Sequence, residues 1–219
     1  MHKSIENLQL INNEIRLKVK ENIYPNVIAV SKTFQMSDIL PLIEYGHIHF
    51  GENKVQEALE KWENLKLNNS KIKLHLIGGL QSNKVKLAIK LFDYIHSVDN
   101  EKLIKKIADE QIKQNKKVKI FIQVNIGNEE QKSGVLKKNL NNLFNYAQTL
   151  GLNIVGLMCI PPQHQDPEPF FKELKNLSEK LNVKDLSMGM SADYIIAVEN
   201  SASFLRIGSK IFGSRIKKF

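Results

Sequence analysis

The sequence alternates short apolar runs, rich in valine, isoleucine and leucine, with longer segments whose apolar residues recur at helical spacing. Successive runs lie about 25 residues apart, which is typical of parallel strands joined by helices. The strand-like runs cover residues 27–30, 47–50, 73–77, 94–98, 118–125, 154–158, 186–188 and 204–207. Because such units cross over in a right-handed sense, the pattern predicts a parallel sheet with helices packed outside it.

Eight units without a change of pattern favour an α/β fold of the (β/α)8 TIM-barrel type over an open doubly wound sheet. A dinucleotide-binding open sheet carries a Gly-x-Gly-x-x-Gly turn after its first strand, where this chain has Ser31, Lys32 and Thr33. The chain has 219 residues, somewhat fewer than the ~250 typical of such barrels, which predicts short loops. No linker-like stretch divides it, so we expect one domain over residues 1–219, with a helix at about residues 3–20 packed on the barrel.

Composition narrows the classes of function. The single cysteine, Cys159, excludes an internal disulfide framework and suits a reducing compartment. The chain shows no signal-peptide core and no apolar run of membrane-spanning length, which predicts a soluble, cytoplasmic protein. The net charge of +9 suggests nucleic-acid binding at first, yet only Arg16, Arg206 and Arg215 among the 32 basic residues are arginines. With lysines dispersed along the chain, we expect no nucleic-acid and no membrane partner.

Lys32 follows the first strand, where α/β folds place their chemistry. Partial burial there lowers the pKa of an amine, and a neutral amine attacks a carbonyl to form a Schiff base. The alternative for this stretch alone is a lysine that reaches solvent. Lys32 is therefore a candidate for covalent chemistry. The other motifs of the sequence are needed to decide between this interpretation and a solvated lysine.

The loops after the seventh and eighth strands predict a phosphate site. They contain Gly189, Ser191, Gly208 and Ser209. In (β/α)8 barrels these two loops commonly bind phosphate through backbone N–H groups, and glycine lets the backbone approach the anion closely. The alternative is that the glycines serve turns and Ser191 caps a helix.

Other groupings of polar residues predict no further site. His47 and His49 share one face of a strand, but no third ligand at zinc-like spacing accompanies them, so we expect no metal. We expect His75 to be a buried histidine with satisfied hydrogen bonds. Residues 78–85 lack the second glycine and the hydroxyl of a P-loop. Glu57 is assigned to the surface of a helix.

Several motifs together resemble those of the pyridoxal phosphate homeostasis proteins, which are single-barrel relatives of the N-terminal domain of alanine racemase. They are AVSKT at 29–33, FGENKVQE at 50–57, HLIGGLQSNK at 75–84, KSG at 132–134, GLM at 156–158, SMGMSAD at 187–193 and RIGSKIFGSR at 206–215. The match extends over nearly the whole chain, in order. Three residues depart from the family pattern: Gly79, Ile195 and Ser201.

The resemblance implies that the cofactor is pyridoxal 5′-phosphate (PLP), held by Lys32 as a Schiff base. It also implies that Arg206 faces the pyridine nitrogen, and it places Asn53 near the cofactor, where orienting the ring oxygen is a hypothesis. The residues expected to contact the phosphate are Ser191, Gly208 and Ser209. All six are cofactor-binding residues in this interpretation, and none is assigned as catalytic.

Two functions remain to be separated. One is a PLP-binding protein that stores cofactor or delivers it to PLP-dependent apo-enzymes; the other is a PLP-dependent amino-acid racemase or related enzyme. Racemisation needs a second base opposite the lysine, which in racemases comes from a further domain of the partner subunit, and this sequence ends at Phe219. We therefore expect a PLP-homeostasis protein without efficient turnover. Separately, we expect the protein to be a monomer.

Overall fold

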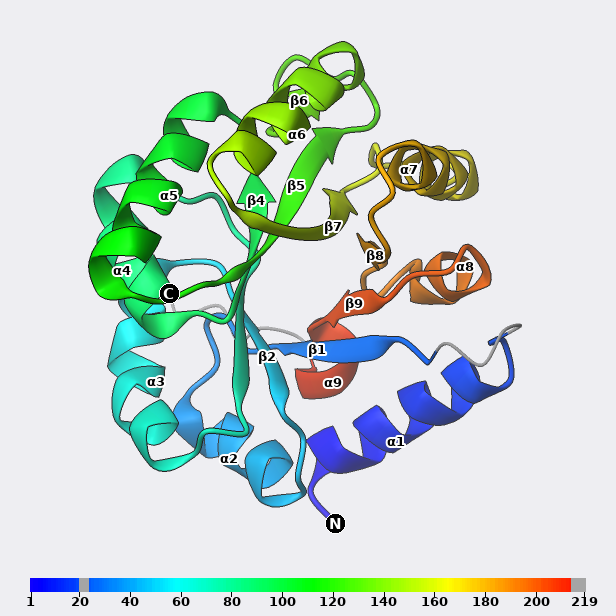
Figure 1. Cartoon of the computed structure of the whole chain (residues 1–219). Coiled ribbons are helices and arrows are strands. Elements are labelled where there is room, and N and C mark those ends of the chain that lie inside the picture. Colours follow the sequence, from blue (N-terminus) through cyan, green and yellow to red (C-terminus); the bar gives the residue numbers. More distant parts are fainter. Residues whose placement is uncertain (20–23, 214–219) are drawn as a thin grey trace.

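The computed structural model describes residues 1–19 and 24–213, and within them eight parallel strands form a closed ring (Figure 1). The strands are β1 (Asn26–Val30), β2 (His49–Glu52), β3 (Lys73–Leu76), β4 (Tyr94–Val98), β5 (Lys119–Asn125), β7 (Asn153–Cys159), β8 (Asp185–Ser187) and β9 (Phe204–Ile207). Neighbours in this order are hydrogen-bonded, and β9 pairs back to β1. The predicted (β/α)8 barrel is confirmed, and the open-sheet alternative is wrong.

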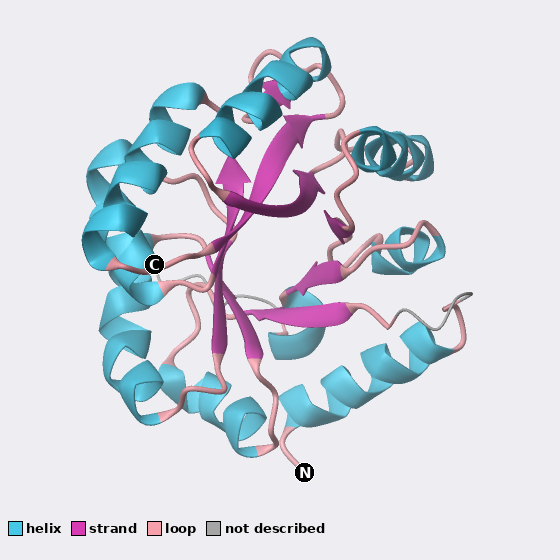
Figure 2. Cartoon of the chain, viewed as in Figure 1, coloured by secondary structure: helices cyan, strands magenta, loops and turns pink. Residues whose placement is uncertain are grey.

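Helices cover the outside of the ring (Figure 2). They are α1 (Lys3–Arg16), α2 (Met36–Glu44), α3 (Val55–Asn68), α4 (Val85–Leu91), α5 (Glu101–Gln114), α6 (Leu140–Thr149), α7 (Glu168–Lys180), α8 (Tyr194–Glu199) and α9 (Ser209–Phe212). Because the strands are all parallel, their carboxyl ends meet at one rim of the barrel, and the loops that follow them share that rim.

Some element boundaries differ from the prediction. The second strand begins at His49 instead of His47. The helix after β5 does not follow the strand directly but begins at Leu140, because the two residues of β6 (Val135–Leu136) pair with β5 and a turn of 3-10 helix follows. The predicted N-terminal helix ends at Arg16, and its expected end, residue 20, lies outside the described residues, as does Arg215.

Helix α1 has an apolar stripe formed by Leu8, Ile11 and Ile15. All three side chains are buried in the hydrophobic core. In Figure 1 it lies between α2 and α8, and it also contacts α9. The Asn7 side-chain amide donates a hydrogen bond to the carbonyl of Ile211 at 2.9 Å. This bond ties the first helix to the last one.

The protein has two distinct buried regions. The larger one lies between the ring of strands and the helices and is mainly aliphatic, with a few aromatic residues such as Trp62 and Phe171 among its largest side chains. The smaller one fills the inside of the barrel and contains Ile28, Tyr94, Phe121, Met158 and Phe204. The barrel interior is therefore aromatic, and it also holds polar side chains described below.

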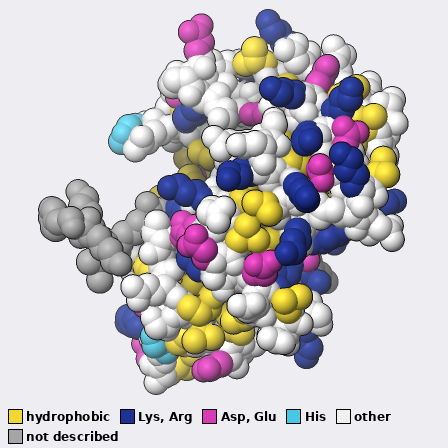
Figure 3. Space-filling view, turned by 90° about the vertical axis from the view of Figure 1, so that its left-hand side faces the viewer, with side chains coloured by type: hydrophobic (Ala, Val, Ile, Leu, Met, Phe, Trp, Pro, Cys, Tyr) yellow, Lys and Arg dark blue, Asp and Glu magenta, His cyan; other side chains and the backbone are white. Residues whose placement is uncertain are grey.

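On the face shown in Figure 3, lysine and arginine side chains are dispersed among acidic, apolar and uncharged ones. They do not gather into a single basic patch on that face. Among the described residues, no helix has the length and apolarity needed to cross a bilayer.

Candidate functional site

The predicted cofactor-binding residues lie at the rim formed by the carboxyl ends of the strands. Lys32 follows β1, and Asn53 comes directly after β2. Arg206 is part of β9, with Gly208 just beyond the strand. A small hollow at this rim is lined by Val30, Lys32, Phe34, Gly208, Ser209 and Gly213. The structure thus brings the candidate lysine and part of the candidate phosphate loop into one hollow.

Ser191 joins the two candidate phosphate loops. Its hydroxyl oxygen lies 3.4 Å from the backbone nitrogens of both Gly208 and Lys210, which donate to it. Gly189, two residues earlier, has a φ of +86°, and a Cβ there would lie 2.6 Å from the Cβ of Ala197. This position requires glycine for conformation and for space.

Gly208 differs in this respect. A Cβ at Gly208 would meet no atom closer than 3.4 Å, the nearest being in Val30. The protein itself thus tolerates a methyl group here. Any strong restriction at this position would have to come from a bound ligand.

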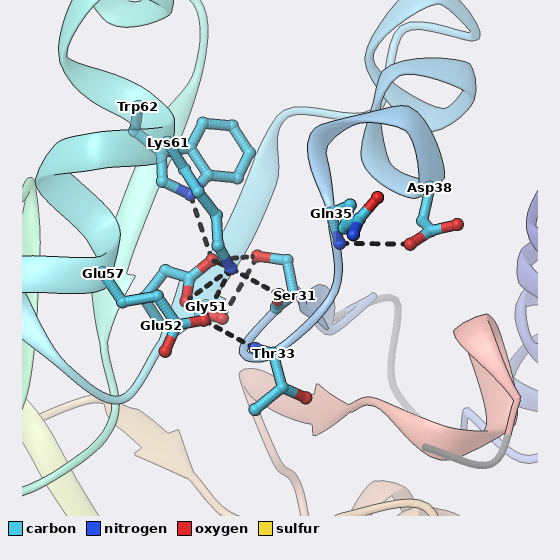
Figure 4. A network of polar contacts seen from close by, with 9 residues as sticks. All are labelled: Ser31, Thr33, Gln35, Asp38, Gly51, Glu52, Glu57, Lys61 and Trp62. Atoms are coloured by element: carbon cyan, nitrogen blue, oxygen red, sulfur yellow. Dashed lines mark hydrogen bonds and ion pairs between the residues drawn. The ribbon is translucent and has the colours of Figure 1, made fainter. Parts of the chain in front are cut away.

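The turn that carries Lys32 is held by a network of polar side chains from α3 (Figure 4). Thr33 has a φ of +68°, which is unfavourable for a β-branched residue. Its N–H donates a hydrogen bond of 2.6 Å to Glu57 Oε1. The same carboxylate lies 2.7 Å from Lys61 Nζ. Glu57 is thus not merely a surface charge of its helix, as the sequence had suggested, but supports the backbone next to Lys32.

The other side of that turn rests on Glu52, whose carboxylate is fully buried. Its Oε1 accepts hydrogen bonds from Ser31 Oγ at 2.7 Å and from Trp62 Nε1 at 3.1 Å. Lys61 Nζ completes the set, 3.2 Å from Glu52 Oε1, and also donates to the carbonyl of Ser31 at 3.0 Å. Buried carboxylates are stable only when paired and hydrogen-bonded in this way. Residues on both sides of Lys32 are therefore anchored to α3.

Arg206 lies inside the barrel and is 5% exposed. Its guanidinium donates to Ser187 Oγ at 2.7 Å and to the carbonyl of Cys159 at 2.8 Å. Both partners are neutral. Burial lowers the pKa of Arg206 from its usual value, while Cys159 and Asp193 act in the opposite direction. The arrangement presents a buried cation that can only donate hydrogen bonds.

Comparison with known proteins identifies the family. The family model described as alanine racemase, N-terminal domain, matches residues 5–216. A pyridoxal phosphate homeostasis protein of Aquifex aeolicus (strain VF5) is 39% identical over 199 residues, which cover 86% of this chain and 86% of that protein. The chain belongs to the pyridoxal phosphate homeostasis protein family. A second member, from Pasteurella multocida (strain Pm70), is 34% identical and covers 96% of this chain and 97% of its own length.

Solved structures agree with this assignment. PipY of Synechococcus elongatus PCC7942, solved without PLP, is 29% identical with a TM-score of 0.86 and covers 97% of this chain and all of its own. The structure of PipY with PLP bound has a TM-score of 0.82 and covers 96% and 100% of the two chains. Alanine racemase from Clostridium difficile 630 has a TM-score of 0.72 at 13% identity, covering 98% of this chain and 58% of that one, which shows a shared fold alone.

Asn53 lies against the loop that follows β3. The Oδ1 atom of Asn53 is buried and has no hydrogen-bond partner among the described residues. Gly78 packs directly on the Asn53 backbone, since a Cβ at Gly78 would lie 2.3 Å from the Asn53 carbonyl oxygen. The close approach of the two loops therefore leaves no room for a side chain at Gly78.

Cys159 is fully buried, and burial raises the pKa of its thiol to about 12. A thiol in such surroundings is inert and packs as a small apolar residue. Among the described residues no group of histidines, cysteines and carboxylates is arranged to hold a metal ion. His47 Nε2 instead donates to the carbonyl of His49 at 2.9 Å, and His49 Nδ1 is hydrogen-bonded to His75 Nε2.

Sequence reasoning missed the support around Lys32, namely Glu52, Glu57, Lys61 and Trp62. The motif 50–57 contained two of them, but its spacing did not show which strand-end turn the carboxylates would reach. The only available signal was that Glu52 closes an apolar strand, where a charged residue needs a buried partner.

Proposed function

We propose that this protein binds pyridoxal 5′-phosphate as a Schiff base on Lys32 and acts in the storage and delivery of the cofactor in the cell. The observation that carries the proposal is the hollow lined by Lys32 together with Gly208 and Ser209. The names of the relatives and the structure of PipY with PLP bound support it. In forming the bond, the Lys32 amine attacks the cofactor aldehyde, a C=N bond replaces the C=O bond, and one water leaves.

The residues present fit such a ligand. The two loops joined by Ser191 offer backbone N–H groups and hydroxyls, which suit a phosphate. Arg206 offers donors to a ring nitrogen, and the unpartnered Asn53 Oδ1 is an acceptor for a ring hydroxyl. When bound, PLP supplies an electron-withdrawing ring to amino-acid chemistry.

Arg206 supports a binding role over efficient turnover. Most PLP enzymes stabilise a protonated pyridine nitrogen with an acceptor, whereas a guanidinium only donates and favours the unprotonated nitrogen. This weakens the electron sink on which carbanion chemistry depends. We therefore propose a carrier and not a racemase.

The binding claim is tested by titrating purified protein with PLP and recording the absorbance spectrum. We expect saturable appearance of a Schiff-base band in the wild type and its loss in Lys32→Ala. The control is Lys172→Ala, because Lys172 lies on α7 and pairs only with Glu168 among the described residues. A Lys32→Ala variant with the wild-type band contradicts the proposal.

Delivery is tested by adding the PLP-loaded protein to the apo-form of a PLP-dependent enzyme in the presence of a phosphatase that destroys free PLP. Recovery of enzyme activity supports transfer, and no recovery limits the protein to storage. We also propose that residues 1–219 act as one domain and as a cytoplasmic monomer, which light scattering and cell fractionation test.

A further inference from the structure

A continuous row of hydrogen-bonded side chains crosses the inside of the barrel and ends at Arg206. Starting from Ser187 Oγ, which accepts from Arg206, His96 Nδ1 lies at 2.8 Å. His96 Nε2 lies 2.9 Å from His75 Nδ1, and His75 Nε2 lies 2.9 Å from His49 Nδ1. The row joins β9, β8, β4, β3 and β2 in turn.

Aromatic side chains hold the two central imidazoles in place. His75 is stacked on Tyr94 with ring centroids 4.3 Å apart and an interplanar angle of 14°, and His96 is stacked on Phe121 at 4.3 Å and 18°. Phe204 contacts both histidines. Both imidazoles are completely buried, so neither can turn to find another partner.

The direction of every hydrogen bond in the row follows from Arg206. A guanidinium only donates, so Ser187 Oγ is the acceptor of that bond. Among the described residues, Ser187 Oγ has one other partner, His96 Nδ1. A buried hydroxyl left without an acceptor is unfavourable by about 1–3 kcal/mol, so Ser187 donates to His96 Nδ1.

The same step then repeats along the row. A neutral imidazole that accepts at Nδ1 carries its proton on Nε2. His96 therefore donates from Nε2 to His75 Nδ1, and His75 donates from Nε2 to His49 Nδ1. A charged imidazole in a central position would place two donors opposite each other. Burial agrees with the neutral state, since it lowers the pKa of His75 and His96 well below the usual value and that of His49 to about 4.

We propose that His49, His75 and His96 are positioning residues for Arg206: they form, with Ser187, a chain of neutral imidazoles protonated at Nε2 that fixes how the guanidinium is held. Cooperative polarisation along such a row spreads part of the positive charge of Arg206 into the barrel, where no carboxylate of the described residues is hydrogen-bonded to it. The link to PLP rests on the proposed function, because it requires Arg206 to face the cofactor. The tautomers themselves do not depend on PLP.

The tautomers are tested on the protein without PLP by nitrogen-15 NMR of the histidine rings at pH 7. We expect His49, His75 and His96 to carry their protons on Nε2. In Ser187→Ala the chain loses the group that sets its direction, and we expect mixed tautomers at His96. The control is Ser178→Ala, since Ser178 is a buried serine that bonds within α7 and should leave all three rings unchanged. An Nδ1 proton on His75 or His96 in the wild type overturns the proposal, as does an unaltered Ser187→Ala spectrum.

The effect on Arg206 is tested with two substitutions of His96. Glutamine offers one acceptor and one donor and can replace the imidazole in the chain, whereas leucine offers neither. We expect His96→Leu to weaken PLP binding about tenfold and to move the absorbance maximum, because a hydrogen bond next to a charged group is lost. His96→Gln should retain both properties. Equal losses in the two variants, at matched folded fraction, contradict a positioning role.

The outcomes separate this proposal from the function itself. If the protein does not bind PLP, the nitrogen-15 result still shows whether the three histidines carry their protons on Nε2. If the tautomers are mixed in the wild type while PLP binds normally, the chain proposal fails and the proposed function stands.

Discussion

Replacement of Glu57 tests whether the turn that carries Lys32 depends on α3. Glu57→Ala removes the 2.6 Å hydrogen bond from the Thr33 N–H and the 2.7 Å ion pair with Lys61. A hydrogen bond to a charged acceptor contributes about 1.5–3 kcal/mol, and a partly exposed ion pair about 0–1 kcal/mol. Thr33 can relax from its left-handed conformation, which is unfavourable by about 1–2 kcal/mol, once the bond is gone.

The net loss in the free energy of unfolding should therefore be about 1–2 kcal/mol, measured by urea denaturation. The relaxed turn no longer holds Lys32 in position, so the affinity for PLP should fall about tenfold. Glu57→Gln keeps an acceptor for the Thr33 N–H. Its losses in the free energy of unfolding and in the free energy of PLP binding should each be less than half of those of Glu57→Ala.

Glu63→Ala is the matched control, because Glu63 lies on the same helix and pairs with Lys90 at the surface. It should change stability by less than about 0.5 kcal/mol and leave PLP affinity unaltered. The reasoning is refuted if Glu57→Ala binds PLP as the wild type does, or if it is no more destabilised than Glu63→Ala.

Three further outcomes are expected. Gly208→Ala should fold normally, because its Cβ meets nothing closer than 3.4 Å, but it should lose more affinity for PLP than for dephosphorylated pyridoxal. Gly79→Ala, whose Cβ meets no atom within 4 Å, is the control, and equal losses of affinity for the two ligands rule out a phosphate role for Gly208. Burial holds the pKa of His47 and His49 at about 4 in the folded protein, while imidazoles of the unfolded chain protonate below about pH 6.5. The free energy of unfolding should therefore fall between pH 6.5 and pH 4, by up to about 1.4 kcal/mol per pH unit per histidine. A free energy of unfolding, measured with urea, that stays constant over this range contradicts the prediction. Purified protein should exchange the α-proton of alanine in deuterated water far more slowly than ~1 s⁻¹, and an ordinary enzymic rate refutes the carrier proposal.

The barrel could be predicted because its signal is local and repeated. Each strand shows as an apolar run and each helix as a periodic stripe, and their order alone indicates parallel units. The short strand Val135–Leu136 was not predictable, because two residues carry no periodicity and pairing with β5 defines it. The motifs also indicated the rim and its residues, since the ends of parallel strands necessarily meet.

The support beneath the site could not be predicted in the same way. Glu57 lies 24 positions from Thr33, and only the angle of α3 against the barrel brings its carboxylate to that N–H. The chain from Arg206 to His49 depends on which residues of four further strands face inward at the same height. That is a property of barrel register, and a single sequence does not display it.

The central claim is that Lys32 holds the cofactor, and borohydride reduction followed by peptide mapping tests it most directly. Reduction converts the C=N bond into a stable secondary amine. The lysine that carried PLP therefore retains the added mass of the phosphopyridoxyl group. We expect the phosphopyridoxyl group on the peptide that contains Lys32, at near-stoichiometric yield. Modification of another lysine, with Lys32 unmodified, contradicts the account.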